Sequence, residues 1–147
     1  FTTLIIINLK KIEMKETKKD ILNRLFIENN LTEEDVFSHQ HYKIITRAGV
    51  NKIEANLNIS IQFEVIRCEP NFAVFKAKAK YGDKEIETFG SALKGNTYKD
   101  GNTNSFYVSE MAEKRAMSRA VLKLAGFYQL GCFSEDESEQ FKRVNNQ

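Results

Sequence analysis

The chain has 147 residues, of which 41% are hydrophobic, including 11 Phe and no Trp. This length fits one domain, and this apolar content supports a core and excludes a wholly disordered chain. The 22 Lys and Arg residues nearly balance the 20 Asp and Glu residues, so net charge alone does not indicate a nucleic-acid partner, and that hypothesis needs local clusters of cations.

The first 13 residues differ in character from the rest. They hold an apolar stretch from Leu4 to Leu9 with no basic residue before it, which makes a poor signal peptide. Met14 opens a more ordinary sequence, so we interpret residues 1–13 as a non-native or disordered leader and residues 14–147 as a single domain. An added N-terminal strand is the alternative. No apolar run reaches the roughly 18 residues that a membrane span needs.

Helical patterns precede any strand. Residues 17–30 begin with a capping box, continue with apolar residues at helical spacing and end at two asparagines. Residues 31–37 predict a short helical turn. Residues 46–57 begin with Thr46, a capping residue, and carry one apolar stripe. The sequence therefore predicts N-terminal helices.

The periodicity then changes to that of strands. Residues 60–67 alternate in polarity, and residues 72–81 alternate apolar residues with lysines. Gly82-Asp83 predicts a two-residue hairpin turn, after which residues 84–92 supply a third strand. We expect a three-stranded antiparallel β-meander.

A polar loop over residues 93–105 leads into a predicted helix from about Ser109 to Phe127. Ser134 and Glu137 form a capping box for a last short helix. The predicted fold class is α+β, with the three-stranded antiparallel meander packed against a long C-terminal basic helix.

The predicted C-terminal helix carries a row of cations. Arg115, Arg119 and Lys123 recur every fourth residue, with Lys114 beside them. Their repeat of about 6 Å along the helix suits successive phosphates. No acid lies four residues from Arg119 or Lys123, which favours phosphate binding over the alternative, a solvated helix face.

Lys76, Lys78 and Lys80 share one face of the middle strand, spaced about 6.7 Å apart. A polyanion lying across them is one interpretation. The other is an exposed sheet face on which glutamates of the next strand are their partners.

Two basic faces, one on a helix and one on a sheet, can border a groove for a single nucleic-acid strand. Aromatic residues in or after the polar loop, with Tyr98 the best placed, supply stacking for bases. The predicted nucleic-acid-binding residues are Lys114, Arg115, Arg119, Lys123, Lys76, Lys78, Lys80 and Tyr98.

The sequence contains no recognisable catalytic motif. There is no Walker A or Gly-rich dinucleotide motif, and no acid or cysteine cluster completes a metal site around His39 and His41. We therefore expect a non-enzyme without metal or cofactor. Cys68 and Cys132 are expected to be free thiols in a reducing, cytoplasmic compartment.

The order of elements resembles the core of the Rad fifty-two-type single-strand annealing proteins, a superfamily that includes phage annealing recombinases. The segments that carry the resemblance are TRAGVNKIEANLNISIQFEVI, FAVFKAKAKYGDKEIETFGSA and EMAEKRAMSRAVLKLAGF, within residues 42–128. Lys114 and Lys123 match the family's basic positions best. The modest net charge and the lack of a partner-recruiting region depart from the family.

The resemblance implies a cytoplasmic homo-oligomer, a ring or a filament, that binds single-stranded DNA between sheet and helix and pairs complementary strands without ATP in phage or prophage recombination, in a bacterial host. Two alternatives stay open. One is an oligomeric adaptor of a mobile element that binds protein rather than DNA, with the acidic tail as its interface. The other is an enzyme with a hidden acid or metal site.

Overall fold

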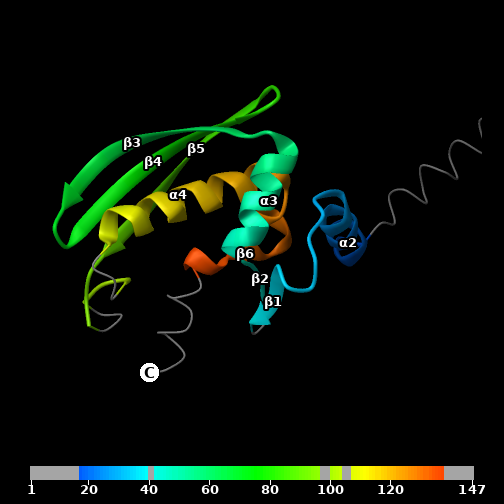
Figure 1. Ribbon diagram of the computed structural model, residues 1–147, viewed down its shortest axis with the longest axis horizontal. Helices are drawn as coiled ribbons and strands as arrows, with labels where there is room; N and C mark the ends of the chain where they lie inside the picture. The colour runs from blue at the N-terminus through cyan, green and yellow to red at the C-terminus, as the bar shows by residue number, and fades with distance from the viewer. Residues whose placement is uncertain (1–16, 40–41, 97–99, 104–106, 138–147) are drawn as a thin grey trace, which may run out of the picture.

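The computed structural model describes residues 17–39, 42–96, 100–103 and 107–137. One helix, α4, lies along one face of a three-stranded sheet, a smaller sheet and helix α3 sit at one end, and α2 is outermost (Figure 1). The predicted mixed α+β class is confirmed. The interpretation of residues 1–13 lies outside the described residues.

The larger sheet is the predicted meander. Strands β3 (Ser60–Glu69), β4 (Phe72–Tyr81) and β5 (Lys84–Leu93) pair antiparallel in the order β3-β4-β5. The tight turn between β4 and β5 uses Gly82 at φ 57°, a conformation that costs glycine little. Alanines and Phe75 of β4 are buried toward α4, while the lysines of β4 point to the opposite side.

A β-bulge interrupts the β3–β4 pairing, because Val65 lies opposite Phe75 and Arg67 lies opposite Val74. Ile66 is the extra residue. Sequence alternation places Ile66 on the polar face, so the bulge was not predicted. An extra residue shifts the side-chain alternation by one position, and Arg67 therefore shares a sheet face with Glu64.

Helix α4 (Val108–Ala125) packs on β4 and β5 and hardly reaches β3. Gly90 of β5 makes this packing close, because a Cβ at that position would collide with the backbone of Ala112 and Ala116. The Thr88 hydroxyl also donates to the carbonyl of Ala116 at 2.6 Å. The side of β3 that faces the helix layer is therefore left largely uncovered.

The predicted N-terminal helices are confirmed as α2 (Lys18–Glu28) and α3 (Arg47–Leu57). Thr17 and Thr46 cap them, each accepting a hydrogen bond from a backbone N–H in the first turn. The buried face of α3 packs against α4. Helix α2 joins the core through the ring of Phe26, which stacks on that of Phe127 at 5.8 Å.

A second sheet was not predicted. Strands β1 (Val36–His39) and β2 (Tyr42–Ile45) pair antiparallel, and β6 (Cys132–Ser134) joins β2 in parallel. The prediction of a helical turn that continued to residue 37 is wrong, because Val36 and Phe37 belong to β1. Strand β2 is central in this sheet because β6, which lies about 90 residues later in the chain, pairs with its other edge.

Helix α4 is not the last element, because the short 3-10 helix η1 (Tyr128–Leu130) and β6 follow it. Residues 135–137 are helical, and the rest of the final predicted helix lies outside the described residues. The Ser134 hydroxyl is buried and makes no hydrogen bond with a described residue, so the predicted capping bond is not seen. Of the helices in the described ranges, none is both long and apolar enough to cross a bilayer.

Candidate nucleic-acid interface

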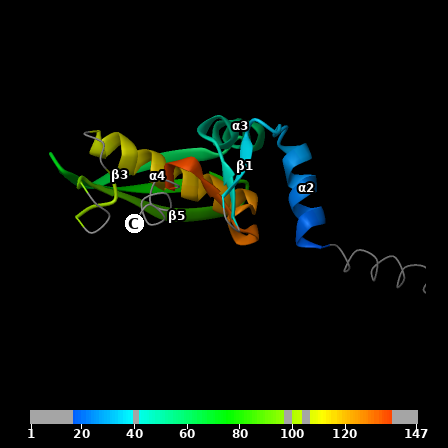
Figure 2. The same ribbon diagram turned by 90° about the horizontal axis from the view of Figure 1, so that it is seen from below.

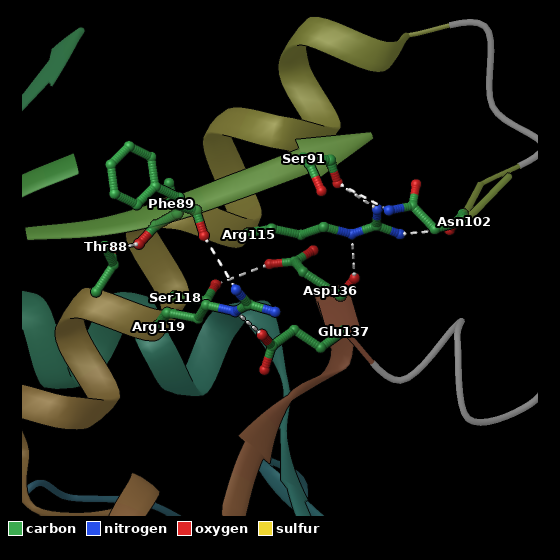
Figure 3. Close-up of polar contacts among 10 residues, drawn as sticks. Thr88, Phe89, Ser91, Asn102, Arg115, Ser118, Arg119, Asp136 and Glu137 are labelled. Atoms are coloured by element: carbon green, nitrogen blue, oxygen red, sulfur yellow. Dashed lines mark hydrogen bonds and ion pairs between the residues drawn. The ribbon is translucent and has the colours of Figure 1, made fainter. Parts of the chain in front are cut away.

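Arg115 is buried in the interior of the protein. Its guanidinium donates to three backbone carbonyls, those of Ser91 at 2.8 Å, Asn102 at 2.9 Å and Asp136 at 3.0 Å (Figure 3). These carbonyls belong to β5, to the loop before α4 and to the segment after β6. Arg115 therefore fastens three parts of the chain together.

The residues after β6, Glu135, Asp136 and Glu137, form what we name the acidic clasp. The Asp136 carboxylate accepts from Arg47 Nε at 2.6 Å and from the Ser118 hydroxyl at 3.0 Å. The Glu137 carboxylate pairs with Arg119. The clasp thereby ties the end of the described chain to α3 through Arg47, and to α4 through Ser118 and Arg119, as Figure 3 shows.

The clasp is also complementary to the start of α3. A Glu135 oxygen accepts from the backbone N–H of Arg47 at 2.8 Å. That N–H belongs to the first turn of α3, where helix N–H groups lack partners within the helix and the positive end of the helix dipole favours a carboxylate.

The prediction that Arg115 and Arg119 face an open channel is wrong. Arg115 is buried against carbonyls, and Arg119 is paired with Glu137 and donates to the carbonyl of Phe89 at 3.1 Å. Helical spacing identified the face of α4 on which these arginines lie. It did not reveal that the acidic clasp covers that face.

The lysines of β4 lie on the outer face of the larger sheet. Lys76 contacts Glu64 at 3.1 Å and Glu87 at 3.7 Å, and Lys78 contacts Glu85 at 3.1 Å. The hydrogen bond that Lys76 donates to Glu64 and the negative charges of both glutamates raise the pKa of Lys76. Lys80 is exposed and makes no ion pair with a described residue.

This outer face carries no excess of positive charge, since each cation on it is matched by a carboxylate of the same face. The cations are Arg67, Lys76, Lys78 and Lys80, and the carboxylates are Glu64, Glu69, Glu85 and Glu87. The face also lies on the side of the sheet away from α4. The predicted groove with both basic rows along its walls is therefore wrong.

Lys114 and Lys123 remain exposed on α4. Lys123 Nζ sits 5.0 Å from the ring centroid of Tyr128, a cation–π distance. Lys114 makes no ion pair with any residue in the described ranges. It stands beside an open cleft of about 220 Å³ between α3 and α4, which Arg47, Asn51, Glu113 and Ser118 also line.

Tyr98, the predicted stacking residue, lies outside the described residues. Tyr107, which directly precedes α4, is 71% exposed. It comes seven residues before Lys114, so the two lie on the same side of the helix, about 10 Å apart along its axis. Arg47 and Asn51 were not predicted, because only the contact between α3 and α4 brings them beside Lys114.

Within residues 17–39, 42–96, 100–103 and 107–137, no three His, Cys, Asp or Glu side chains gather in a metal-binding arrangement. His41 lies outside these ranges. Both thiols are free, and burial raises the pKa of Cys132 to about 11.

The site thus consists of a cleft between two helices with an exposed aromatic ring nearby. Two cations, Arg47 and Lys114, and two carboxylates, Glu113 and Asp136, line the cleft, and of the two cations Lys114 is the one without an ion pair in the described ranges. Comparison of the chain with family models, curated proteins and solved structures finds no match.

Proposed function

We propose that this protein binds single-stranded DNA and anneals complementary strands without ATP, and that the strand follows the cleft between α3 and α4. The observation that carries the proposal is the placement of Lys114. It is exposed and without an ion pair in the described ranges. It lines the cleft and lies on the same side of α4 as the exposed Tyr107.

The two side chains fit the two parts of a nucleotide chain. Lys114 provides a point charge for a phosphate, and the exposed Asn51 adds an amide group to the same cleft. The exposed Tyr107 ring provides a surface on which a base stacks. Stacking on a protein ring requires a base that is not already stacked in a duplex, which favours a single strand.

Charge balance elsewhere supports this choice of surface. On the outer face of the larger sheet, Lys76 and Lys78 are paired with glutamates, and the arginines of α4 are engaged by the acidic clasp. A polyanion on either surface would have to displace carboxylates from paired cations, whereas Lys114 makes no ion pair in the described ranges, although Glu113 and Asp136 also line its cleft. The resemblance of the element order to single-strand annealing proteins favours the same function.

Fluorescence anisotropy with labelled oligo-dT tests binding. We expect binding at about 50 mM salt that weakens at about 200 mM, because bound counterions are released from the strand. Lys114→Glu should weaken binding about tenfold or more and lower the salt slope by about 0.7, the value of one phosphate contact on a single strand. Tyr107→Ala should weaken binding by about 1–3 kcal/mol, the value of one stacked base.

Lys84→Glu is the matched control, since Lys84 is exposed at the β4–β5 hairpin and does not line the cleft. It makes the same change in net charge and should leave binding nearly unchanged. Equal losses in Lys84→Glu and Lys114→Glu, or no binding at low salt, would refute the proposed site. Annealing of complementary dye-labelled oligonucleotides without ATP then tests the second half of the proposal.

A protein-binding adaptor is the second candidate, and one observation favours it. Phe63, Val65 and Ile66 are exposed together on β3, and contiguous apolar surface on a soluble domain marks interaction sites.

A further inference from the structure

The two edges of the larger sheet differ in how their backbone groups are used. On β5, the carbonyl of Ser91 accepts from Arg115 and from Asn102, at 2.8 and 3.3 Å. The carbonyl of Phe89 accepts from Arg119 at 3.1 Å (Figure 3). Side chains therefore occupy the C-terminal part of the β5 edge, from Phe89 to Leu93, which hinders the pairing of another strand there.

The β3 edge is open. It is ten residues long, and in the part of the chain that the structure describes no strand or side chain pairs with its outer backbone groups. Three apolar side chains are exposed on it, Phe63 by 40%, Val65 by 56% and Ile66 by 49%. Helix α4, which covers β4 and β5, hardly reaches this strand (Figures 1 and 2).

The sequence of β3 is complementary to itself when two copies run antiparallel about the point between Val65 and Ile66. In that register, Glu64 of each copy lies opposite Arg67 of the other, and Phe63 lies opposite Cys68. Opposite charges and apolar residues therefore meet across the strand pair, as stable cross-strand pairs do. Glu64 and Arg67 also share one face of the sheet, so their side chains meet on the same side.

The bulge also favours a second copy of β3 as the partner strand. Because Ile66 is an extra residue, the backbone groups before and after it are out of step with those of a regular strand. A second copy of β3 carries the same extra residue, and in this register the two bulges face each other. Registers that centre the pair on residue 64 or residue 67 instead place like charges opposite each other.

We propose that β3 is a homodimer interface, in which two copies pair their β3 strands antiparallel around a twofold axis between Val65 and Ile66. The two three-stranded sheets then form one six-stranded sheet, and its two ends are β5 edges whose C-terminal parts side chains occupy. The twofold axis makes this a closed dimer, and the occupied parts of β5 oppose further growth through the sheets. The proposal does not depend on DNA binding.

Light scattering across a protein dilution series tests the interface. We expect the wild type to have twice the 17.0 kDa mass of the chain at high concentration. Arg67→Glu places two carboxylates opposite each other, and Glu64→Arg places two guanidiniums opposite each other. Each should raise the concentration for half-dissociation by about tenfold or more, since juxtaposed like charges oppose association. The combined Glu64→Arg, Arg67→Glu variant restores opposite charges and should regain the dimer.

Glu87→Arg is the matched control for Glu64→Arg, because both substitutions remove a carboxylate partner of Lys76, at 3.7 and 3.1 Å, while Glu87 lies on β5. It should leave the dimer intact, and circular dichroism should show every variant folded. A monomeric wild type, an assembly whose size Arg67→Glu leaves unchanged, or a double variant no better than the single ones would overturn the proposal.

Discussion

Arg47 and Asp136 are 89 residues apart in the sequence, and the guanidinium Nε of one lies 2.6 Å from a carboxylate oxygen of the other. The pair is asymmetric, because the Asp136 side chain is 3% exposed and that of Arg47 is 48% exposed. Removing Arg47 therefore leaves a buried charge without its counterion, whereas removing Asp136 leaves a charge that water can solvate.

We expect Arg47→Met to destabilise the protein more than Asp136→Asn does. Arg47→Met leaves the buried Asp136 carboxylate with only the Ser118 hydroxyl as a donor among the described residues, and should lower the free energy of unfolding by about 2–3 kcal/mol. Asp136→Asn leaves a cation that reaches water, and should lower it by about 1 kcal/mol. Urea unfolding of the two variants measures the difference. Equal losses would show that solvent reaches Asp136 as readily as Arg47.

Arg115 should be required for stability. Arg115→Met keeps the approximate length of the side chain but removes the donors to the carbonyls of Ser91, Asn102 and Asp136. Because these three carbonyls lose a donor, we expect the free energy of unfolding to fall by about 3 kcal/mol or more. Lys114→Met on the exposed neighbouring position is the control, and should change the free energy of unfolding by about 0.5 kcal/mol or less.

The Asp35 carboxylate should make stability depend on pH. It accepts from Lys52 Nζ at 2.7 Å and from the Thr32 N–H at 2.9 Å, which lower the pKa of Asp35 below its ordinary value of 3.8. A lowered folded pKa contributes stability above the unfolded value, and this contribution is lost as pH falls through the folded pKa. Asp35→Asn should therefore be less stable than wild type from neutral pH down to about pH 5, and the gap should narrow below 3.8.

Urea titrations of the wild type and Asp35→Asn at several pH values measure this gap. A gap of constant size down to acidic pH would mean that the carboxylate charge is not what stabilises the loop before β1.

The two thiols should differ in reactivity. Cys132 is buried and its pKa is raised to about 11, whereas Cys68 is exposed on β3. Because the thiolate is the reactive form, an aromatic disulfide reagent at neutral pH should titrate one thiol quickly in the native protein, and both in denaturant. Dilute protein is needed, since the proposed dimer covers Cys68. Cys68→Ser should abolish the fast reaction, and rapid labelling of Cys132 would contradict its burial.

Local patterns predicted the elements whose structure depends on neighbours in sequence. Thr17 and Thr46 cap the helices that they were predicted to cap, and the turn at Gly82 joins the predicted strands. Strands β1, β2 and β6 were missed because each is only three or four residues long, and their pairing depends on segments far apart in the chain.

The candidate site was predictable only in part, for the same reason. The four-residue spacing of Arg115 and Arg119 predicted that they share a side of α4. Whether such a side faces solvent or protein depends on the acidic clasp. It belongs to the acidic tail, which the sequence offered only as an interface for a protein partner. Lys114 kept its predicted exposure because no described segment packs over it.

The parallel pairing of β2 with β6 has a consequence for the order of folding. Residues 43–45 leave the ribosome long before their partners at 132–134 exist, so the β1–β2 hairpin is held only by its own two strands while most of the protein is synthesised. Isolated two-stranded hairpins are marginal in water. The β1–β2 hairpin therefore becomes stable late, after translation has passed β6.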